Sequence, residues 1–396
     1  MTEQQKSALG LARIHLRCYR VRMLTHDSRV RDFPALEKMT YLNTAAENTP
    51  PNCVWEALQV YREHKSMGMR GRDLHFPELD RCRKVTAELL EQGEGDVAFC
   101  SCSSEAYNLL ASALNLQAGD EAVITDLDFP AGATPWLRWP TWPKANVWKN
   151  RAGALELSDL ETLLNESTKL VQVSYVSFLT GHRVAWPELK DLVRRKAPNA
   201  ILSVDITQAF GRLVLDCLDA DCLISSTYKW QLGTHGAGIV AIPKAGAARL
   251  TTHAGGWYNL SNAFDADRFE RAVPFEGAKS FAVGMPPFPA IYGLRAGLDY
   301  LKDVGIKNIA QHTDPMVQRV HEGLTELGIN PMSPAQPGYS SGIVSFTHDR
   351  DAEIHAALLE KNIHVMHQAG RIRVSVHGYN QPEDVEAFLE GMRSAL

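Results

Sequence analysis

Polar residues capable of cofactor chemistry stand at the ends of two neighbouring apolar runs near the middle of the chain. Asp205 directly follows the first run, and Ser226, Tyr228 and Lys229 follow the second. Pyridoxal phosphate needs such a set: a lysine amine for its aldehyde, a carboxylate that keeps its pyridine nitrogen protonated, and hydroxyl groups for its phosphate. Taken singly, an aspartate at a strand end is an ordinary helix cap, and a lysine is an ordinary surface charge. The ordered set favours a pyridoxal phosphate site.

This segment also resembles the class V aminotransferase superfamily, a group of pyridoxal phosphate enzymes that includes cysteine desulfurases, selenocysteine lyases, kynureninase and isopenicillin N epimerase. The family signature is Asp-x-x-Gln followed by His or Tyr and then Lys, and Asp205, Gln208, Tyr228 and Lys229 match it. The resemblance implies that Lys229 forms the Schiff base, that Asp205 pairs with the pyridinium and that Gln208 donates to the ring oxygen. It also implies that Ser226 and Tyr228 are phosphate ligands.

A second group of candidate phosphate ligands lies in the segment CSCSSEAYN, between an expected strand at 97–99 and an expected helix at 104–116. Small hydroxyl residues at a helix N-terminus leave backbone N–H groups free, and such groups bind phosphate. The family that this chain resembles has Thr-Thr-Glu-Ala-x-Asn here. The resemblance therefore implies that Cys102, Ser103 and Ser104 hold the phosphate.

Four further residues are candidates by the same resemblance. Phe129 follows an expected strand at 122–125, where relatives stack an aromatic ring on the pyridine; a loop aromatic that pins its own turn is the alternative. Asn43 belongs either to a Tyr-Leu-Asn-x-Ala-Ala loop near the substrate carboxylate or to a plain turn. Arg70 stands where relatives reach into the partner subunit's active site, and a plain surface charge is the alternative. Arg183 matches a Gly-x-Arg motif near the pocket rim.

The segment RIRVSVHGYN near the C-terminus supplies the expected contact with the substrate carboxylate. Relatives use the arginine seven positions before the asparagine, which is Arg373 here. A guanidinium suits this role because its two-pronged geometry matches a carboxylate. Arg371, two positions earlier on the same face of the expected strand, is the competing candidate.

A missing cysteine constrains the reaction type. Desulfurases need a cysteine nucleophile in the loop upstream of that arginine, and residues 349–396 contain no cysteine. We expect a lyase that cleaves a C–S bond or eliminates a β-substituent from a cysteine-derived α-amino acid, because a lysine alone can serve that chemistry. An amino-acid epimerase or an aminotransferase of the same superfamily is one alternative. A non-catalytic protein that binds pyridoxal phosphate is another.

Composition excludes several other classes of function. The formal net charge of -5 and the pI of about 6.3 give no general attraction to nucleic acid or to anionic membranes. No stretch approaches the roughly 20 apolar residues of a membrane span, and no signal peptide is recognisable, so a cytoplasmic location is expected. The 7 cysteines include no CxxC pair, which indicates reduced thiols, and no metal site is predicted.

The elements that must position the site alternate as strand and helix between residues 97 and 242. This order predicts a doubly wound, mostly parallel α/β sheet with its site at the strand C-termini. The resemblance implies fold-type I with a seven-stranded sheet, a smaller C-terminal α+β domain and a homodimer with shared active sites. We expect an N-terminal arm (1–40), a large pyridoxal-phosphate-binding domain (41–290), and a bridging helix with the small domain (291–396).

Overall fold

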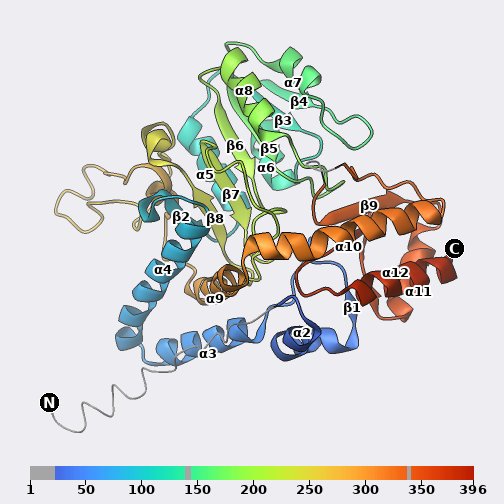
Figure 1. The fold of residues 1–396 in the computed structure, drawn as a ribbon. Helices are drawn as coiled ribbons and strands as arrows, with labels where there is room; N and C mark the ends of the chain where they lie inside the picture. Colours follow the sequence, from blue (N-terminus) through green and yellow to red (C-terminus); the bar gives the residue numbers. More distant parts are fainter. Residues whose placement is uncertain (1–22, 139–143, 337–339) are drawn as a thin grey trace, which may run out of the picture.

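The computed structural model describes residues 23–138, 144–336 and 340–396. Its centre is a seven-stranded sheet in the order β2-β8-β7-β6-β5-β3-β4, in which β8 alone runs against the other strands (Figure 1). The strands are β2 (Val97–Cys100), β3 (Glu121–Thr125), β4 (Lys144–Trp148), β5 (Thr168–Ser174), β6 (Ile201–Asp205), β7 (Cys222–Ser226) and β8 (Gly238–Ala241). The predicted doubly wound, mostly parallel sheet is confirmed.

Helices cover both faces of this sheet, which is why its inner strands are apolar along almost their whole length. The covering helices are α5 (Ser103–Leu114), α6 (Pro130–Leu137), α7 (Leu157–Leu163) and α8 (Trp186–Lys196). Neighbouring side chains of one strand point to opposite faces, so Leu170 of β5 packs in the core beside α5 and α6, whereas Val171 packs in the core beside α7 and α8.

Three helices form a further layer at the base of the large domain: α3 (Asn52–Ser66), α4 (Met69–Leu89) and α9 (Phe288–Val304). The hydroxyl of Tyr292 in α9 joins them, because it lies 2.7 Å from Nδ1 of His64 and 3.0 Å from Nδ1 of His75. α4 begins at Met69 and continues through Pro77. Pro77 lies inside the helix, a position where proline usually marks a helix start or break.

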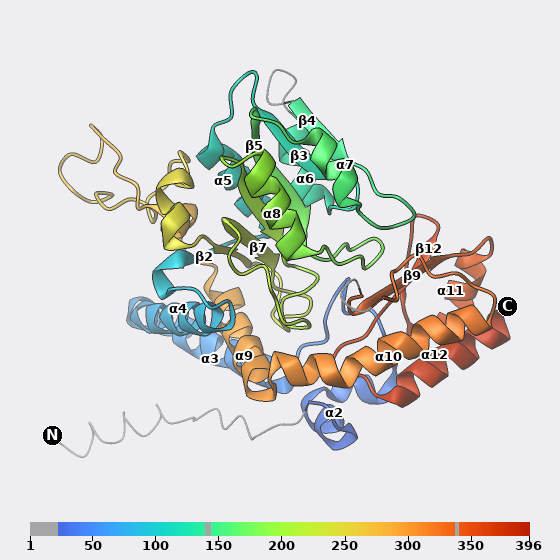
Figure 2. The same cartoon turned by 45° about the horizontal axis from the view of Figure 1, so that its top comes forward.

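The small C-terminal domain is an antiparallel sheet packed against helices. Its strands are β9 (Ile343–Thr347), β11 (Met366–Gln368) and the central β12 (Arg371–Ser375), and its helices are α10 (Ile306–Glu326), α11 (Asp351–Glu360) and α12 (Pro382–Ala395). Figure 2 shows α10 running from the base of the large domain to the small domain. This arrangement confirms the predicted α+β character of the C-terminal part.

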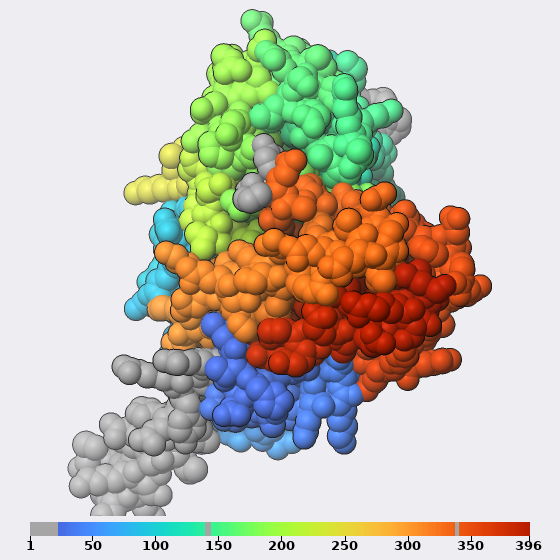
Figure 3. Space-filling model, turned by 45° about the vertical axis from the view of Figure 1, so that its right-hand side comes forward, coloured from blue at the N-terminus to red at the C-terminus, as the bar shows by residue number. Residues whose placement is uncertain are grey.

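The described part of the predicted N-terminal arm packs on the small domain. It contains α2 (His26–Asp32) and a 3-10 helix at Pro34–Lys38, and it leads into β1 (Thr40–Tyr41). Elsewhere the chain forms β10 (Ile363–His364) and 3-10 helices at Glu94–Asp96, Lys244–Arg249 and Gly277–Phe281. Arg29 forms a 2.7 Å ion pair with Asp384, and β1 pairs in parallel with β10. Figure 3 shows this N-terminal segment lying against the C-terminal helices.

Residues 1–22 of the predicted arm lie outside the described residues, and the domain limits remain a proposal. Within the ranges that the structure describes, no helix combines the length and the apolar character needed to cross a membrane.

Candidate active site

The predicted cofactor residues meet where β6 and β7 end. Asp205 is the last residue of β6, Ser226 is the last residue of β7, and Lys229 follows in the next turn. Thr207 joins the two strand ends, since its N–H donates to Asp205 Oδ1 at 2.8 Å and its hydroxyl accepts from the Ser226 N–H at 2.9 Å. The residues share one edge of the sheet because β6 and β7 are parallel.

Lys229 is a buried amine, with 7% of its surface exposed. Burial and then the positive charge of Arg373 lower the pKa of its ammonium group to about 8, against the opposing charge of Asp205. Its Nζ lies 5.4 Å from the ring centroid of Phe129 and 5.6 Å from that of Tyr228. A lysine with this pKa is partly deprotonated at neutral pH, so it can attack a carbonyl group.

Phe129 presents an aromatic face beside this amine. It precedes α6, remains 43% exposed and packs edge-on against Phe178, with the ring centroids 5.1 Å apart. Asp128 fixes the turn that carries it, because its buried carboxylate accepts the N–H groups of Thr125 and Ser174 at 3.1 and 2.6 Å. Burial raises the pKa of Asp128 to about 7. A flat ring can stack on the exposed face of Phe129 within reach of the lysine.

The N-terminus of α5 lies beside the end of β7. The Ser226 hydroxyl donates to Ser103 Oγ at 2.9 Å, so two of the predicted phosphate ligands are in contact. Cys102 precedes α5, but its side chain makes no capping hydrogen bond, which leaves the N–H groups of Ser103 and Ser104 for an external acceptor. Burial raises the pKa of the neighbouring Tyr228 hydroxyl. These donors form a cradle that is chemically suited to a phosphate.

Gln208 is buried and already uses both ends of its amide. Its Nε2 donates to the Ala45 carbonyl at 3.0 Å, and its Oε1 accepts from the indole N–H of Trp230 at 2.7 Å. The predicted contact with the ring oxygen therefore depends on the second amide hydrogen. His377 holds Trp230 in turn, because its Nε2–H donates to the Trp230 carbonyl at 3.0 Å. Burial lowers the pKa of His377 to about 3, so its imidazole is neutral.

Glu47 and His235 adjoin the site, and sequence reasoning did not single them out. The His235 ring stacks on Tyr228 with the centroids 4.3 Å apart, and its Nε2 lies 3.1 Å from Glu47 Oε2. Burial raises the pKa of Glu47, while the charges of His235 and Lys229 lower it. Glu47 lies in the loop before α3 and His235 in the loop before β8, and neither occupies a position of the motifs that the chain shares with the family.

Two arginines of β12 face the site from the small domain. Arg373 is 1% exposed, and its Nη1 donates to the Phe178 carbonyl at 2.8 Å. Burial and then the charge of Arg371 lower the pKa of Arg373 to about 9. The guanidinium of Arg371 lies 5.5 Å from the centroid of the Phe178 ring. Since Phe178 packs on Phe129, β12 forms a wall of the site opposite the large domain.

The Aminotransferase class-V family model matches residues 40–388. The chain belongs to this family. It is 26% identical over 362 residues to the uncharacterized aminotransferase YcbU of Bacillus subtilis, an alignment that covers 90% of this chain and 95% of YcbU. It is 27% identical over 396 residues to a probable cysteine desulfurase of Pyrococcus abyssi, covering 91% of this chain and 94% of that protein.

Solved structures agree with this class V aminotransferase assignment. The apo cysteine desulfurase of Thermococcus onnurineus NA1 superposes with a TM-score of 0.84 at 25% identity, covering 93% of this chain and 97% of that one. The cystine C-S lyase C-DES, in complex with cysteine persulfide, superposes with a TM-score of 0.81 at 22% identity, covering 92% of this chain and 99% of that one. The latter similarity shows the shared fold, which is fold-type I.

Membership in the class V aminotransferase family confirms the predicted pyridoxal phosphate cofactor, and the residues present fit it. The amine of Lys229 suits its aldehyde, and the buried carboxylate of Asp205 suits its pyridine nitrogen. The hydroxyls of Ser103 and Ser226, with the open start of α5, suit its phosphate. The assignment of each residue to one part of the cofactor remains a proposal.

The three remaining predicted site residues lie in different surroundings. Asn43 forms a β-bridge with Ser375 at the end of β12, and its buried Oδ1 has no partner among the described residues. Arg70 is exposed on the first turn of α4, which suits a contact with another subunit. Arg183 pairs with Asp216 at 3.3 Å, so its charge is already compensated without a substrate.

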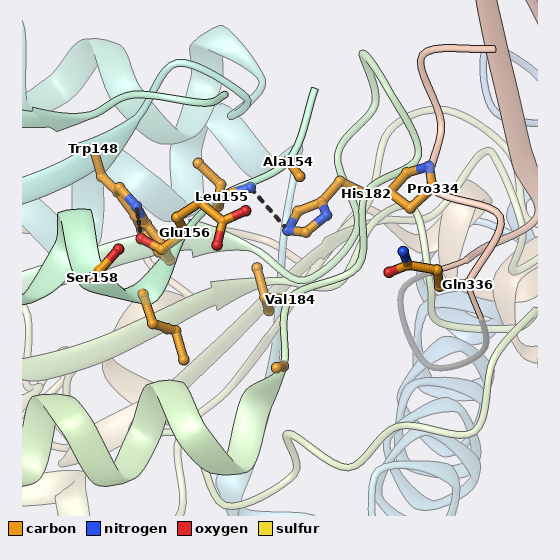
Figure 4. A pocket seen from close by; sticks show the side chains of 11 residues that line it. Trp148, Ala154, Leu155, Glu156, Ser158, His182, Val184, Pro334 and Gln336 are labelled. Atoms are coloured by element: carbon orange, nitrogen blue, oxygen red, sulfur yellow. Dashed lines mark hydrogen bonds between the residues drawn. The ribbon is translucent and has the colours of Figure 1, made fainter. Parts of the chain in front are cut away.

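A separate cavity of about 470 Å³ lies between the large domain and the segment that precedes β9 (Figure 4). His182 lines it, and Nε2 of this residue accepts the Leu155 N–H at 3.3 Å. Burial lowers the pKa of His182 to about 4, so the ring is neutral. Lys229 and Asp205 do not line this cavity, which is therefore distinct from the cofactor site.

Proposed function

We propose that the protein is a pyridoxal-phosphate-dependent lyase that removes a β-substituent, such as a sulfur group, from a cysteine-derived α-amino acid. The observation that carries this proposal is a buried Lys229 with a pKa of about 8, in a chain that has no cysteine after Cys222. Elimination needs a base and a proton donor for the leaving group, whereas a persulfide mechanism needs a cysteine nucleophile.

Each residue has its own task in this reaction. Bound pyridoxal phosphate supplies an electron sink for negative charge at the substrate α-carbon. Lys229 takes the α-proton onto Nζ, since its lowered pKa leaves the amine partly unprotonated near neutral pH. The negative charge of Asp205 keeps a proton on the pyridine nitrogen. Arg373 binds the α-carboxylate and thereby fixes the orientation of the α-carbon.

Glu47 is the proposed proton donor to the leaving group. The Cβ–S bond breaks with both electrons on sulfur, and the resulting thiolate takes a proton from the Glu47 carboxyl. Burial raises the pKa of Glu47, which keeps that proton available at a higher pH than in an ordinary carboxyl, and His235 lies 3.1 Å away to replace it.

Leaving-group dependence tests the role of Glu47. Glu47→Gln should slow release of an alkyl thiolate, which needs the proton, more than release of a nitrophenyl thiolate, which is stable as an anion. Parallel steady-state assays with the two S-substituted cysteines compare the losses. An equal loss with both substrates would assign Glu47 another role.

Transamination is the second candidate function, because the 26% identical relative YcbU is described as an aminotransferase. It would use Lys229 and Asp205 in the same way but would return a keto acid and retain the amino group. Epimerisation would return the other enantiomer of the substrate. Family membership favours an enzyme over a non-catalytic binding protein.

A substrate screen with the holoenzyme separates these possibilities. S-substituted cysteines and common amino acids are added, the absorbance spectrum is followed, and pyruvate, ammonia and keto acids are measured. Pyruvate and ammonia that appear with wild type but not with Lys229→Ala support the lyase. A keto acid that appears without ammonia would instead support transamination. Chiral chromatography of the recovered amino acid detects epimerisation, and a spectral change with neither released product nor the opposite enantiomer would favour a binding protein.

We also propose that the protein is a homodimer. Large apolar side chains are exposed on α3, on α4 and in the segment between β8 and α9, among them Trp55, Met69, Phe264 and Phe269. Such exposure is typical of a subunit interface. Sedimentation measures the state directly, and a fully active monomer would rule out both the dimer and a cross-subunit role for Arg70. The cytoplasmic location stays a prediction.

A further inference from the structure

Arg371 and Arg373 occupy alternate positions of β12 and extend from the same face of the small-domain sheet. In register they lie opposite Thr347 and Ser345 of β9. Both are deeply buried, with 3% and 1% of their surface exposed. Both also contact Phe178, Arg371 through the aromatic ring and Arg373 through the backbone carbonyl. The two cationic groups therefore share one wall of the site.

The same edge of the guanidinium is unpaired in both arginines. Nε and Nη2 of Arg371, and Nε and Nη2 of Arg373, are buried and have no hydrogen-bond partner among the described residues. The N–H groups of these two nitrogens point in parallel and form an edge that binds a carboxylate with two hydrogen bonds. Nη1 is used in each case, for the Phe178 carbonyl by Arg373 and for the Gln368 carbonyl, at 3.5 Å, by Arg371. Each arginine thus offers one complete anion-binding edge.

The groups around the two arginines do not fully balance their positive charge. Burial lowers the pKa of Arg371, and the charge of Arg371 adds to burial in lowering the pKa of Arg373. The charge of Tyr41 raises the pKa of Arg373, and the charge of Glu47 raises the pKa of the nearby Lys229. Buried cations without a counter-charge are costly unless a ligand supplies one. A single α-carboxylate leaves one of the two arginines uncompensated.

We propose that the substrate carries a second anionic group, and that Arg371 binds this group while Arg373 binds the α-carboxylate. The substrate class is an acidic α-amino acid whose side chain ends in a carboxylate or a similar oxyanion. The α-amino acid part of this statement rests on the proposed function. The second anion-binding edge rests on the geometry of Arg371.

Binding of simple dicarboxylates tests the second edge apart from catalysis. Calorimetry with the holoenzyme compares malonate, succinate, glutarate and adipate with the monocarboxylates of the same chain length. At least one dicarboxylate should bind about tenfold to a hundredfold more tightly than its monocarboxylate, because it gains a charged, two-pronged contact. Arg371→Gln should remove this advantage. Arg393→Gln, which changes an exposed arginine of α12 paired with Glu390, should preserve it.

Matched amino acids test the same edge in the presence of the cofactor. S-carboxymethylcysteine is compared with S-carbamoylmethylcysteine, and aspartate with asparagine, by the concentration that changes the holoenzyme spectrum. The acidic member of each pair should act at a concentration about tenfold to a hundredfold lower in wild type. In Arg371→Gln the two members should act alike. Arg371→Lys keeps the charge without the two-pronged edge and should give an intermediate preference.

The outcomes separate this inference from the proposed function. Equal binding of acidic and neutral members, or a preference that survives Arg371→Gln, would overturn the second anion site. If no amino acid changes the spectrum while dicarboxylates keep an Arg371-dependent advantage, the α-amino acid function fails and the second anion site stands. An unchanged cofactor spectrum and thermal midpoint establish that Arg371→Gln is folded. If Arg371→Gln does not fold, the same comparisons are made with Arg371→Lys.

Discussion

Replacing Arg373 with glutamine tests whether the substrate is an α-amino acid whose carboxylate this residue holds. Arg373 is almost completely buried, so water screens its charge little, and its free Nε and Nη2 can make two charge-assisted hydrogen bonds. Losing such a contact should cost about 2 to 4 kcal/mol of transition-state binding. That loss corresponds to a roughly thirtyfold to thousandfold fall in kcat/KM for the amino acid that the screen identifies.

A second effect of Arg373→Gln follows from charge. Arg373 helps to lower the pKa of Lys229, so its removal favours the protonated ammonium and should raise that pKa. The pH at which the apoenzyme recaptures pyridoxal phosphate should therefore move upward, as stopped-flow absorbance will show. Wild-type kcat/KM in the variant would refute the carboxylate contact. Loss of the cofactor itself would instead show that Arg373 acts through the structure.

Three further predictions concern the cofactor residues and acid stability. Borohydride reduction of the holoenzyme should fix the pyridoxyl group on Lys229, and peptide mapping that finds it on another lysine would contradict the site. Asp205→Ala should retain the cofactor but lose activity by orders of magnitude, because the pyridine nitrogen loses its proton; near-normal turnover in steady-state assays would show that another group holds this proton. The free energy of unfolding should fall as the pH drops from about 6.5 toward 3, since burial lowers the pKa of His377 to about 3 and in this range the unfolded chain alone protonates it. The decline due to His377 is about 1.4 kcal/mol per pH unit. Denaturant titrations of His377→Gln should show a shallower decline, and an unchanged one would assign the acid sensitivity to other groups.

The large-domain half of the site could be predicted from sequence because its residues stand directly after consecutive strands. Parallel strands bring their carboxyl ends to one edge, so the order of Asp205, Ser226 and Lys229 along the chain already implies that they meet. The start of α5 was predictable for a similar reason, since small hydroxyl residues precede a clear helical pattern. These inferences need only local periodicity and the rule for parallel strands.

Contacts between distant loops could not be predicted in this way. The Glu47 and His235 contact joins the loop before α3 to the loop before β8, and no pattern in either segment shows that they approach each other. The engagement of Gln208 with Ala45 and Trp230 is equally long-range. The sequence also presents Arg371 and Arg373 as competing candidates, because a strand pattern shows that they share a face but not that each has an unpaired guanidinium edge.

The small domain contacts the turn of the large domain that carries the catalytic lysine. The small domain's His377 donates to the backbone of Trp230, the residue that follows Lys229. Fully buried Arg212 of the large domain adds a second link, because its Nε donates to the Val376 carbonyl at 3.2 Å. Since the arginines proposed to bind the substrate lie on this same small domain, a substrate that bridges them to Lys229 also spans the domain contact. Any shift of β12 that changes the contacts of these arginines with the substrate would therefore also move the turn that carries the lysine.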